Sequence, residues 1–306
     1  MLYILLALIA IILIASYFTY VFTFRARKDR ARDPFILPDR EEYTKDQKTM
    51  RDLIMEMNEV SFESVYIKSF DGLTLTARYI HVKDNAPLQI QCHGYRGNPV
   101  RDFCGGNKLA RENGHNSLVI EQRAHLDSEG NVISFGVNER KDVLSWIEYA
   151  VKRFGDDIQI ILSGVSMGAA TVLMASEYNH KNVKCVVADC PYSAPHDIIK
   201  SVAKSMGFPS FIAMPLVRLG AFLFGHFRLG AASCIEAVKK TRHPILLIHG
   251  EADSFVPCAM SREIKNACKS DVRLETFPDA GHALSFIKDF GRYQRVCQEF
   301  FSAHLK

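Results

Sequence analysis

The longest apolar stretch of the chain lies at its start. Residues 2–24 contain no charged side chain and are mostly leucine, isoleucine, alanine, tyrosine and phenylalanine. About 18 apolar residues in a helix are enough to cross a bilayer, so this stretch predicts a transmembrane helix. A cleaved signal peptide is the alternative. However, the stretch is longer than the apolar core of such a peptide, no charged segment precedes it, and no clear Ala-x-Ala cleavage site follows.

Basic residues after the apolar stretch predict its orientation. Membrane proteins concentrate lysine and arginine in the segments on the cytoplasmic side. The segment that follows residue 24 contains Arg25, Arg27, Lys28, Arg30 and Arg32. We therefore expect residues 1–24 to anchor a single-pass protein of the cell membrane, with the rest of the chain on the cytoplasmic side.

A charged segment and one amphipathic helix come next. Residues 25–40 include Pro34 and Pro38 and are typical of a linker. Between residues 41 and 58, apolar positions recur at the i, i+3, i+4 and i+7 spacing of one helix face, namely Met50, Leu53, Ile54 and Met57. We expect residues 25–60 to form a linker and a helix whose apolar face packs on the following domain.

Short apolar runs dominate residues 61–306 and alternate with helical patterns. The runs predict strands at 64–70, 73–82, 88–92, 118–122, 159–165, 183–188, 244–248 and 273–277. The first two are separated by Asp71-Gly72, a strong hairpin signal. Alternation of such strands with helices predicts an α/β fold whose mostly parallel sheet is covered by helices on both faces.

One insertion interrupts this alternation. Residues 192–243 are rich in apolar side chains but contain Pro209, Pro215, Gly220 and Gly225, which favour short helices. We interpret the segment as a helical cap and expect its apolar residues between 208 and 224 to form an acyl pocket. A simple packing layer is the alternative, and Arg218 together with the prolines argues against a second membrane span.

Composition narrows the function classes. The chain of 306 residues is 48% hydrophobic, which allows one sizeable domain or two small ones. Its net charge is only +4 and its sequence has no long basic stripe, so nothing indicates a nucleic-acid partner. The eight cysteines are scattered without a C-x-x-C pair, so we expect reduced structural cysteines and no zinc site. No Walker or Rossmann motif is present, and we expect no cofactor and no metal.

One strand ends in a motif that points to chemistry. The run at 159–165 leads directly into Gly164-Val165-Ser166-Met167-Gly168. In a strand, tight turn and helix with this pattern, the serine hydroxyl is exposed at the edge of the sheet, and the glycines avoid collisions with neighbouring backbone. Ser166 is therefore a candidate nucleophile.

Three motifs together resemble the α/β-hydrolase superfamily, and within it the branch of bacterial esterases, monoacylglycerol lipases and serine aminopeptidases. The resemblance covers roughly residues 60–304 and rests on His93-Gly94-Tyr95, the motif around Ser166, and His249-Gly250-Glu251-Ala252-Asp253. One departure is Arg123-Ala124-His125-Leu126, where that branch usually has glycine in place of Ala124 and Leu126. We expect this departure to change the local turn and to leave the chemistry intact.

The remaining site residues follow from the predicted strand ends. His282 is the only histidine in the loop after the last predicted strand, where it can take the proton of Ser166 and return it to the leaving group. Asp253 is preferred over Asp189 as the acid that orients the imidazole, and Asp279 lies too close to His282 in sequence. The backbone amides of Tyr95 and Met167 are the expected oxyanion donors.

We therefore expect a membrane-anchored serine hydrolase that cleaves a small-molecule carboxylic ester with an acyl, lipid-like or aryl group. A peptidase, aminopeptidase or thioesterase of the same fold is an alternative, because these enzymes share the same machinery. A non-catalytic, membrane-anchored binding protein is a further alternative, although every position of the expected triad is filled. No nucleic-acid partner is expected.

Overall fold

The centre of the protein is an eight-stranded sheet. The computed structural model describes residues 1–27, 32–38 and 41–305, and the strand order is β1-β2-β4-β3-β5-β6-β7-β8. The strands are β1 Glu63–Lys68, β2 Thr74–Ile80, β3 Leu88–Cys92, β4 Asn116–Glu121, β5 Ile160–Val165, β6 Val183–Asp189, β7 Ile245–Gly250 and β8 Val272–Phe277. β2 is antiparallel to both β1 and β4, and all other neighbouring strands are parallel. Every predicted strand is present within a few residues, so the predicted fold is confirmed.

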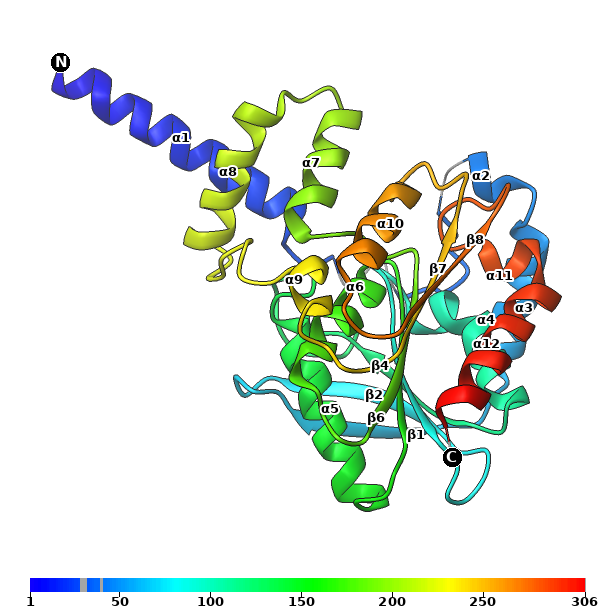
Figure 1. Cartoon of the computed structure of the whole chain (residues 1–306). Helices are drawn as coiled ribbons and strands as arrows, with labels where there is room; N and C mark the ends of the chain where they lie inside the picture. Colours follow the sequence, from blue (N-terminus) through cyan, green and yellow to red (C-terminus); the bar gives the residue numbers. More distant parts are fainter. Residues whose placement is uncertain (28–31, 39–40, 306) are drawn as a thin grey trace.

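Both faces of the parallel strands are buried, which explains their continuous apolar sequences. In β6, Val186 and Ala188 join the large core cluster on one face, whereas Cys185 and Val187 join a second cluster on the other. Successive side chains of a strand point to opposite faces, so an unbroken apolar run supplies both. The first face is covered by α5 Glu139–Phe154, α6 Met167–Ala175, α9 Cys234–Val238 and α10 Cys258–Ala267, and the second mainly by α4 Pro99–Glu112 and α12 Phe290–His304 (Figure 1). A 3₁₀ turn, Ser176–Tyr178, follows α6.

The first helix projects from the body of the protein. α1, Leu2–Thr23, is the one helix in the described part of the chain that is long and apolar enough to cross a membrane (Figure 1). Its outer part is exposed, but Phe24 directly after it is fully buried and packs edge-on against Phe135 and Phe227. The chain continues along the domain, because the Ala26 amide donates to the Asn131 carbonyl over 2.9 Å. The end of α1 therefore belongs to the domain core.

The segment expected to be a cap contains α7 Pro195–Ser205, α8 Ser210–Leu223 and α9. α8 lies across α1 (Figure 1). The two helices can approach closely because Gly220 has no Cβ, which would otherwise collide with the Ser16 carbonyl. Tyr17 of α1 packs on Phe224 with ring centroids 5.2 Å apart. Phe208, Phe211 and Phe222 stay more than half exposed. Other apolar residues of the segment, such as Ile198, Val217 and Val238, are buried in the large core cluster. The apolar residues of this segment thus join the core, pack on α1 or face outward.

The predicted amphipathic helix forms two pieces, α2 Glu41–Thr44 and α3 Gln47–Asn58. Ile54 and Met57 of α3 are buried in a cluster with Phe103 and Cys104 of α4. α11, Ser285–Lys288, lies nearby and contributes to the same side of the molecule. The apolar face of α3 therefore packs on the domain, as its periodicity predicts.

Candidate active site

Ser166 lies at the turn between β5 and α6. Its φ of 55° and ψ of −116° are strained for a residue with a side chain, and its amide donates to the Asp189 carbonyl over 2.8 Å. A Cβ at Gly164 would collide with the Gly168 backbone, and one at Gly168 would collide with the Cys92 carbonyl. The glycines of the motif are needed because β3, β5 and α6 approach so closely here.

The structure brings Ser166, His282 and Asp253 together in one hydrogen-bonded chain. His282 Nε2 lies 2.9 Å from Ser166 Oγ, and His282 Nδ1 lies 2.7 Å from Asp253 Oδ2. An ionised carboxylate only accepts hydrogen bonds, so Nδ1 carries the ring proton and Nε2 is left to accept from the Ser166 hydroxyl. All three residues are buried. This arrangement suits removal of the hydroxyl proton by His282.

Asp253 is held in its charged form. The amides of Phe255 and Val256 donate to Oδ1 over 2.9 and 2.8 Å. Burial alone would raise the pKa of Asp253, but hydrogen bonds from His249, His282 and the Val256 amide outweigh burial and hold the pKa well below its usual range. The carboxylate can therefore stabilise a positive charge that develops on His282.

The loop after β3 presents the second expected amide. Neither the Tyr95 amide nor the Met167 amide has a hydrogen-bond acceptor among the residues that the structure describes. Asp102 of α4 fixes the loop, because its Oδ2 accepts from the Gly94 amide over 2.9 Å and its Oδ1 accepts from Arg101. Met167 directly follows Ser166, and a Cβ at Gly94, next to Tyr95, would lie 3.6 Å from Ser166 Cβ. Both unpaired amides therefore belong to backbone next to Ser166 and remain available to a ligand.

Tyr95 and Arg96 connect this loop to α1. The Tyr95 hydroxyl donates to the Thr23 carbonyl over 2.7 Å, and the Arg96 guanidinium donates to the Phe22 carbonyl over 2.7 Å and the Arg25 carbonyl over 3.1 Å. The last carbonyls of a helix have no partner within the helix, so these side chains cap the C-terminus of α1. This link could not be predicted from the sequence, because the apolar pattern of residues 2–24 does not indicate which residues the last turn of α1 contacts.

The three histidines of the other motifs play supporting roles. His93 is fully buried, accepts from the Gln122 amide over 3.1 Å, and has its pKa lowered to about 3 by burial, so it is neutral. His249 Nδ1 lies 2.6 Å from Ser261 Oγ, and His249 Nε2 lies 2.9 Å from the Val256 carbonyl oxygen. His125 Nε2 accepts from the Arg96 amide over 3.1 Å. Each of them shapes a loop around the site.

One group of possible metal ligands occurs in the described residues, Cys190, Asp253 and His282. Asp253 and His282 already bond to each other, and His282 also bonds to Ser166. Burial raises the pKa of the Cys190 thiol well above its usual range, which keeps it protonated and a poor ligand. The donor set therefore does not fit a metal ion.

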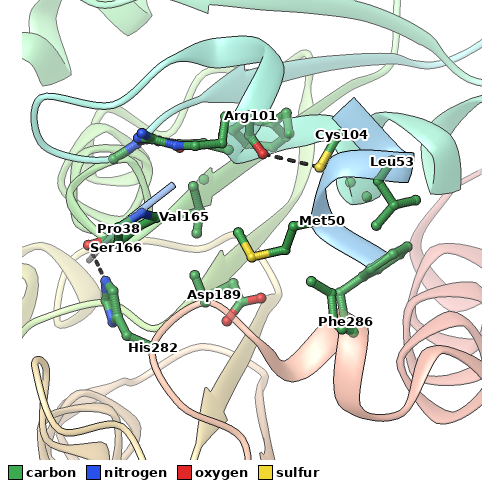
Figure 2. Close-up of a pocket in the computed structure, with 18 of the residues that line it drawn as sticks. Pro38, Met50, Leu53, Arg101, Cys104, Val165, Ser166, Asp189, His282 and Phe286 are labelled. Carbon is green, nitrogen blue, oxygen red and sulfur yellow. Dashed lines mark hydrogen bonds and ion pairs between the residues drawn. The ribbon is translucent and has the colours of Figure 1, made fainter. Parts of the chain in front are cut away.

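A cavity of about 260 Å³ opens beside Ser166. Its walls include Phe103 of α4 and Tyr293 of α12. Figure 2 shows Met50 and Leu53 of α3 and Phe286 of α11 on the same walls, with Asp189 at the end of β6. No described residue between 192 and 243 lines it. The expectation that the cap forms the pocket beside Ser166 is therefore wrong for this cavity, because the apolar residues of that segment are buried in the core, pack on α1 or face outward.

Two residues of the cavity wall were missed as site residues. The Tyr43 hydroxyl donates to the His282 carbonyl over 2.8 Å, so α2 supports the loop that carries the imidazole. Met50 of α3 reaches toward Ser166 and Asp189 (Figure 2). The spacing of Met50, Leu53, Ile54 and Met57 signalled a packing face, but a helical period does not reveal which surface that face covers.

The chain matches two family models. Residues 134–306 match the prolyl oligopeptidase family, and residues 32–208 match the X-Pro dipeptidyl-peptidase (S15) family. Among curated proteins, the uncharacterized protein YqkD of Bacillus subtilis (strain 168) is 24% identical over 251 residues, which are 81% of this chain and 82% of that protein. The uncharacterized protein YfhR of Escherichia coli (strain K12) is 25% identical over 77% of this chain and 78% of its own length.

Solved structures with the same fold include esterases and a peptidase. The esterase Pf2001 of Pyrococcus furiosus has a TM-score of 0.65 at 21% identity and covers 82% of this chain and 96% of its own. Est1E of Butyrivibrio proteoclasticus with bound ferulic acid has a TM-score of 0.60 at 20% identity, over 79% of this chain and 99% of its own. The acylaminoacyl peptidase of Pyrococcus horikoshii has a TM-score of 0.60 at 18% identity, over 84% of this chain but 44% of its own.

These matches agree with the sequence motifs. The structural likeness concerns the fold, and each family model covers more than half of the 306 residues. The protein is therefore a serine hydrolase of the α/β-hydrolase fold that belongs to the prolyl oligopeptidase family and also matches the X-Pro dipeptidyl-peptidase family over residues 32–208.

Proposed function

We propose that the protein cleaves a carboxylic ester through an acyl-enzyme on Ser166. The observation that carries this proposal is the chain of hydrogen bonds from Ser166 Oγ through the His282 ring to Asp253, over 2.9 and 2.7 Å. In the proposed reaction, Ser166 Oγ attacks the ester carbonyl while His282 Nε2 takes the hydroxyl proton. The amides of Tyr95 and Met167 donate to the oxyanion of the tetrahedral intermediate.

The second half of the reaction restores the enzyme. The intermediate collapses as His282 gives its proton to the leaving alcohol, which leaves the acyl group on Ser166. Water then attacks the acyl-enzyme, His282 takes the proton of the water, and the carboxylic acid departs as the proton returns to Ser166 Oγ. Asp253 keeps the imidazole in the tautomer that both halves require and stabilises the imidazolium.

The walls of the cavity favour an ester with an apolar acyl group. Leu53, Phe103 and Phe286 lie on three different helices around the cavity, so an acyl chain could bury its methylenes there. Hydrolysis of amides at a peptide terminus is the second candidate, because both matching family models are peptidase families.

A substrate panel tests the choice. The full chain in detergent is assayed with p-nitrophenyl esters from acetate to octanoate, acyl thioesters and aminoacyl p-nitroanilides. We expect ester hydrolysis whose kcat/KM rises about fourfold per added methylene until the cavity is full, since each buried methylene contributes about 0.8 kcal/mol. The Ser166→Ala variant is the blank. Turnover of anilides alone would favour the peptidase, and a flat profile from acetate to octanoate would reject an acyl pocket.

We also propose that α1 anchors the enzyme in a membrane and is retained. Phe24 is fully buried, and the Phe22 and Thr23 carbonyls of α1 and the Arg25 carbonyl after it accept hydrogen bonds from Tyr95 and Arg96. Removal of this segment as a signal peptide would empty a core position and remove the Thr23 carbonyl that accepts from the Tyr95 hydroxyl. The basic residues after α1 favour a cytoplasmic domain.

Cell fractionation checks the anchor. We expect the mature protein to keep residues 1–24 by intact mass, to stay with membranes after alkaline carbonate extraction, and to resist protease added to intact cells. A mature N-terminus beyond Phe24 would contradict the anchor. Digestion of the domain without cell lysis would place it on the outer face.

A further inference from the structure

Asp189 is the one acidic residue of the cavity beside Ser166 whose charge the described residues leave poorly compensated. Asp189 is the last residue of β6 and is 7% exposed. Oδ2 accepts from the Tyr293 hydroxyl over 3.1 Å, but Oδ1 has no hydrogen-bond partner among the residues that the structure describes. Buried polar atoms are nearly always paired, so an unpaired carboxylate oxygen indicates an absent partner.

The charges around the cavity do not supply that partner. Asp102, the other acid that lines it, is paired with Arg101 and accepts from the Gly94 amide. No ion pair between described residues includes Asp189. Burial raises the pKa of Asp189 to about 6, against smaller opposing effects of His249 and Tyr293. In its ionised form the carboxylate can only accept hydrogen bonds.

Asp189 is also placed where a substrate would pass. Its backbone carbonyl accepts from the Ser166 amide over 2.8 Å, so the two residues are fixed side by side. Both line the same cavity, and Figure 2 shows the Asp189 carboxylate turned toward it, with the Met50 side chain extending above. A methionine side chain is unbranched, so Met50 can change rotamer when a group enters the cavity.

Tyr293, which donates to Asp189, is held in place by aromatic packing. The Tyr293 ring packs edge-on against Phe286, with centroids 5.5 Å apart, and lies 5.9 Å from Phe277. Its hydroxyl is therefore aimed at Asp189 before any ligand binds. The acid and the hydroxyl form a fixed polar spot in a cavity whose other walls include Leu53 and Phe103.

We propose that Asp189, oriented by Tyr293, is a specificity subsite that binds a hydrogen-bond donor, a hydroxyl or an ammonium group, on an otherwise apolar acyl chain. This inference rests on the proposed ester hydrolysis and deepens it. A site built around a buried acceptor discriminates strongly against substrates that lack the donor, because the acceptor is then left unpaired.

Matched substrate pairs test the subsite. The full chain in detergent hydrolyses p-nitrophenyl esters of two to eight carbons in three forms, with the acyl chain ending in a methyl, a hydroxyl or an amino group at equal heavy-atom length. The measured quantity is the kcat/KM ratio of the donor-bearing ester to its methyl analogue. At the chain length that reaches Asp189, we expect this ratio to fall by about tenfold or more in Asp189→Leu, which has a similar volume and no acceptor.

Tyr293→Phe is the matched control, since it keeps the carboxylate and removes only the supporting hydroxyl. We expect it to retain a preference for the donor. The hydroxyl and amino arms distinguish a neutral donor from an ammonium group.

The outcomes separate the two proposals. If wild-type Ser166 is not labelled by a fluorophosphonate and no ester is cleaved, the proposed function fails. If Ser166 is labelled and esters are cleaved but the ratio is the same in wild type and Asp189→Leu at every chain length, the subsite is overturned. An equal loss for all substrates in Asp189→Leu, with slower labelling, would likewise assign Asp189 a structural role and overturn it.

Discussion

Replacing Ser166 by alanine is expected to abolish labelling by a fluorophosphonate probe and to lower kcat for esters by about 10⁶-fold. Ser166 Oγ is the only atom removed, and it is the atom that lies 2.9 Å from His282 Nε2. His282→Ala is expected to cost a similar factor, because a nucleophile without its base keeps its proton. Ser166 and His282 act together, so the loss of either one disables catalysis. The Ser166→Ala/His282→Ala double variant should therefore be no slower than either single variant.

Folding should be unaffected by the serine substitution, which the thermal unfolding midpoint checks. The Ser166 hydroxyl contributes no hydrogen bond to the core beyond the one to His282 among the described residues. Full ester hydrolysis by Ser166→Ala, with an unchanged unfolding midpoint, would remove the basis of the acyl-enzyme mechanism.

Asp253→Asn is expected to lower kcat by about 10⁴-fold. An asparagine amide can donate to His282 Nδ1, which would place the ring proton on Nε2 and leave no acceptor for the Ser166 hydroxyl. The hydrogen bonds from the Phe255 and Val256 amides to Oδ1 can persist, so the loop should keep its shape. The measurement is single-turnover acylation with a p-nitrophenyl ester.

Asp279→Asn is a matched control. Asp279 is exposed, lies three residues before His282, and has a φ of 52°, a left-handed conformation that asparagine also adopts readily. We expect the kcat of the Asp279→Asn variant to stay within about twofold of the wild-type value. Near-normal acylation by Asp253→Asn together with loss in Asp189→Asn would transfer the orienting role to Asp189.

The sheet could be predicted because each of its strands carries its own signal. Runs such as residues 183–188 are apolar throughout, and in the structure their alternate side chains fill core clusters on both faces. The turn at Ser166 could also be predicted from a local signal. Its glycines avoid collisions with backbone of the same motif and of the neighbouring strand. Sites at the carboxyl ends of parallel strands then followed from fold geometry.

The cavity could not be predicted in this way. Its walls include residues of α3 and α4 and of α11 and α12, two pairs of helices that are far apart in the sequence. The helical period predicts which face of each helix is apolar, but not which element that face contacts. The apolar residues from Phe208 to Phe224 looked like a pocket because composition does not distinguish a wall from a helix that packs on α1. Asp189 was weighed only as a triad acid, because its unpaired oxygen and its bond to Tyr293 exist only in three dimensions.

If α1 anchors the protein in a membrane, as proposed, its direct attachment to the domain would determine how the enzyme meets its substrate. The Phe24 ring is buried in the core, and Tyr95, beside the catalytic turn, binds the last turn of α1. With α1 in a bilayer, the domain could not swing on a tether, and Ser166 would stand at a fixed height and angle above the lipid headgroups. Substrates that partition into the membrane surface would then reach the cavity from one direction, and changes in bilayer thickness that tilt α1 would be transmitted to the Tyr95 amide.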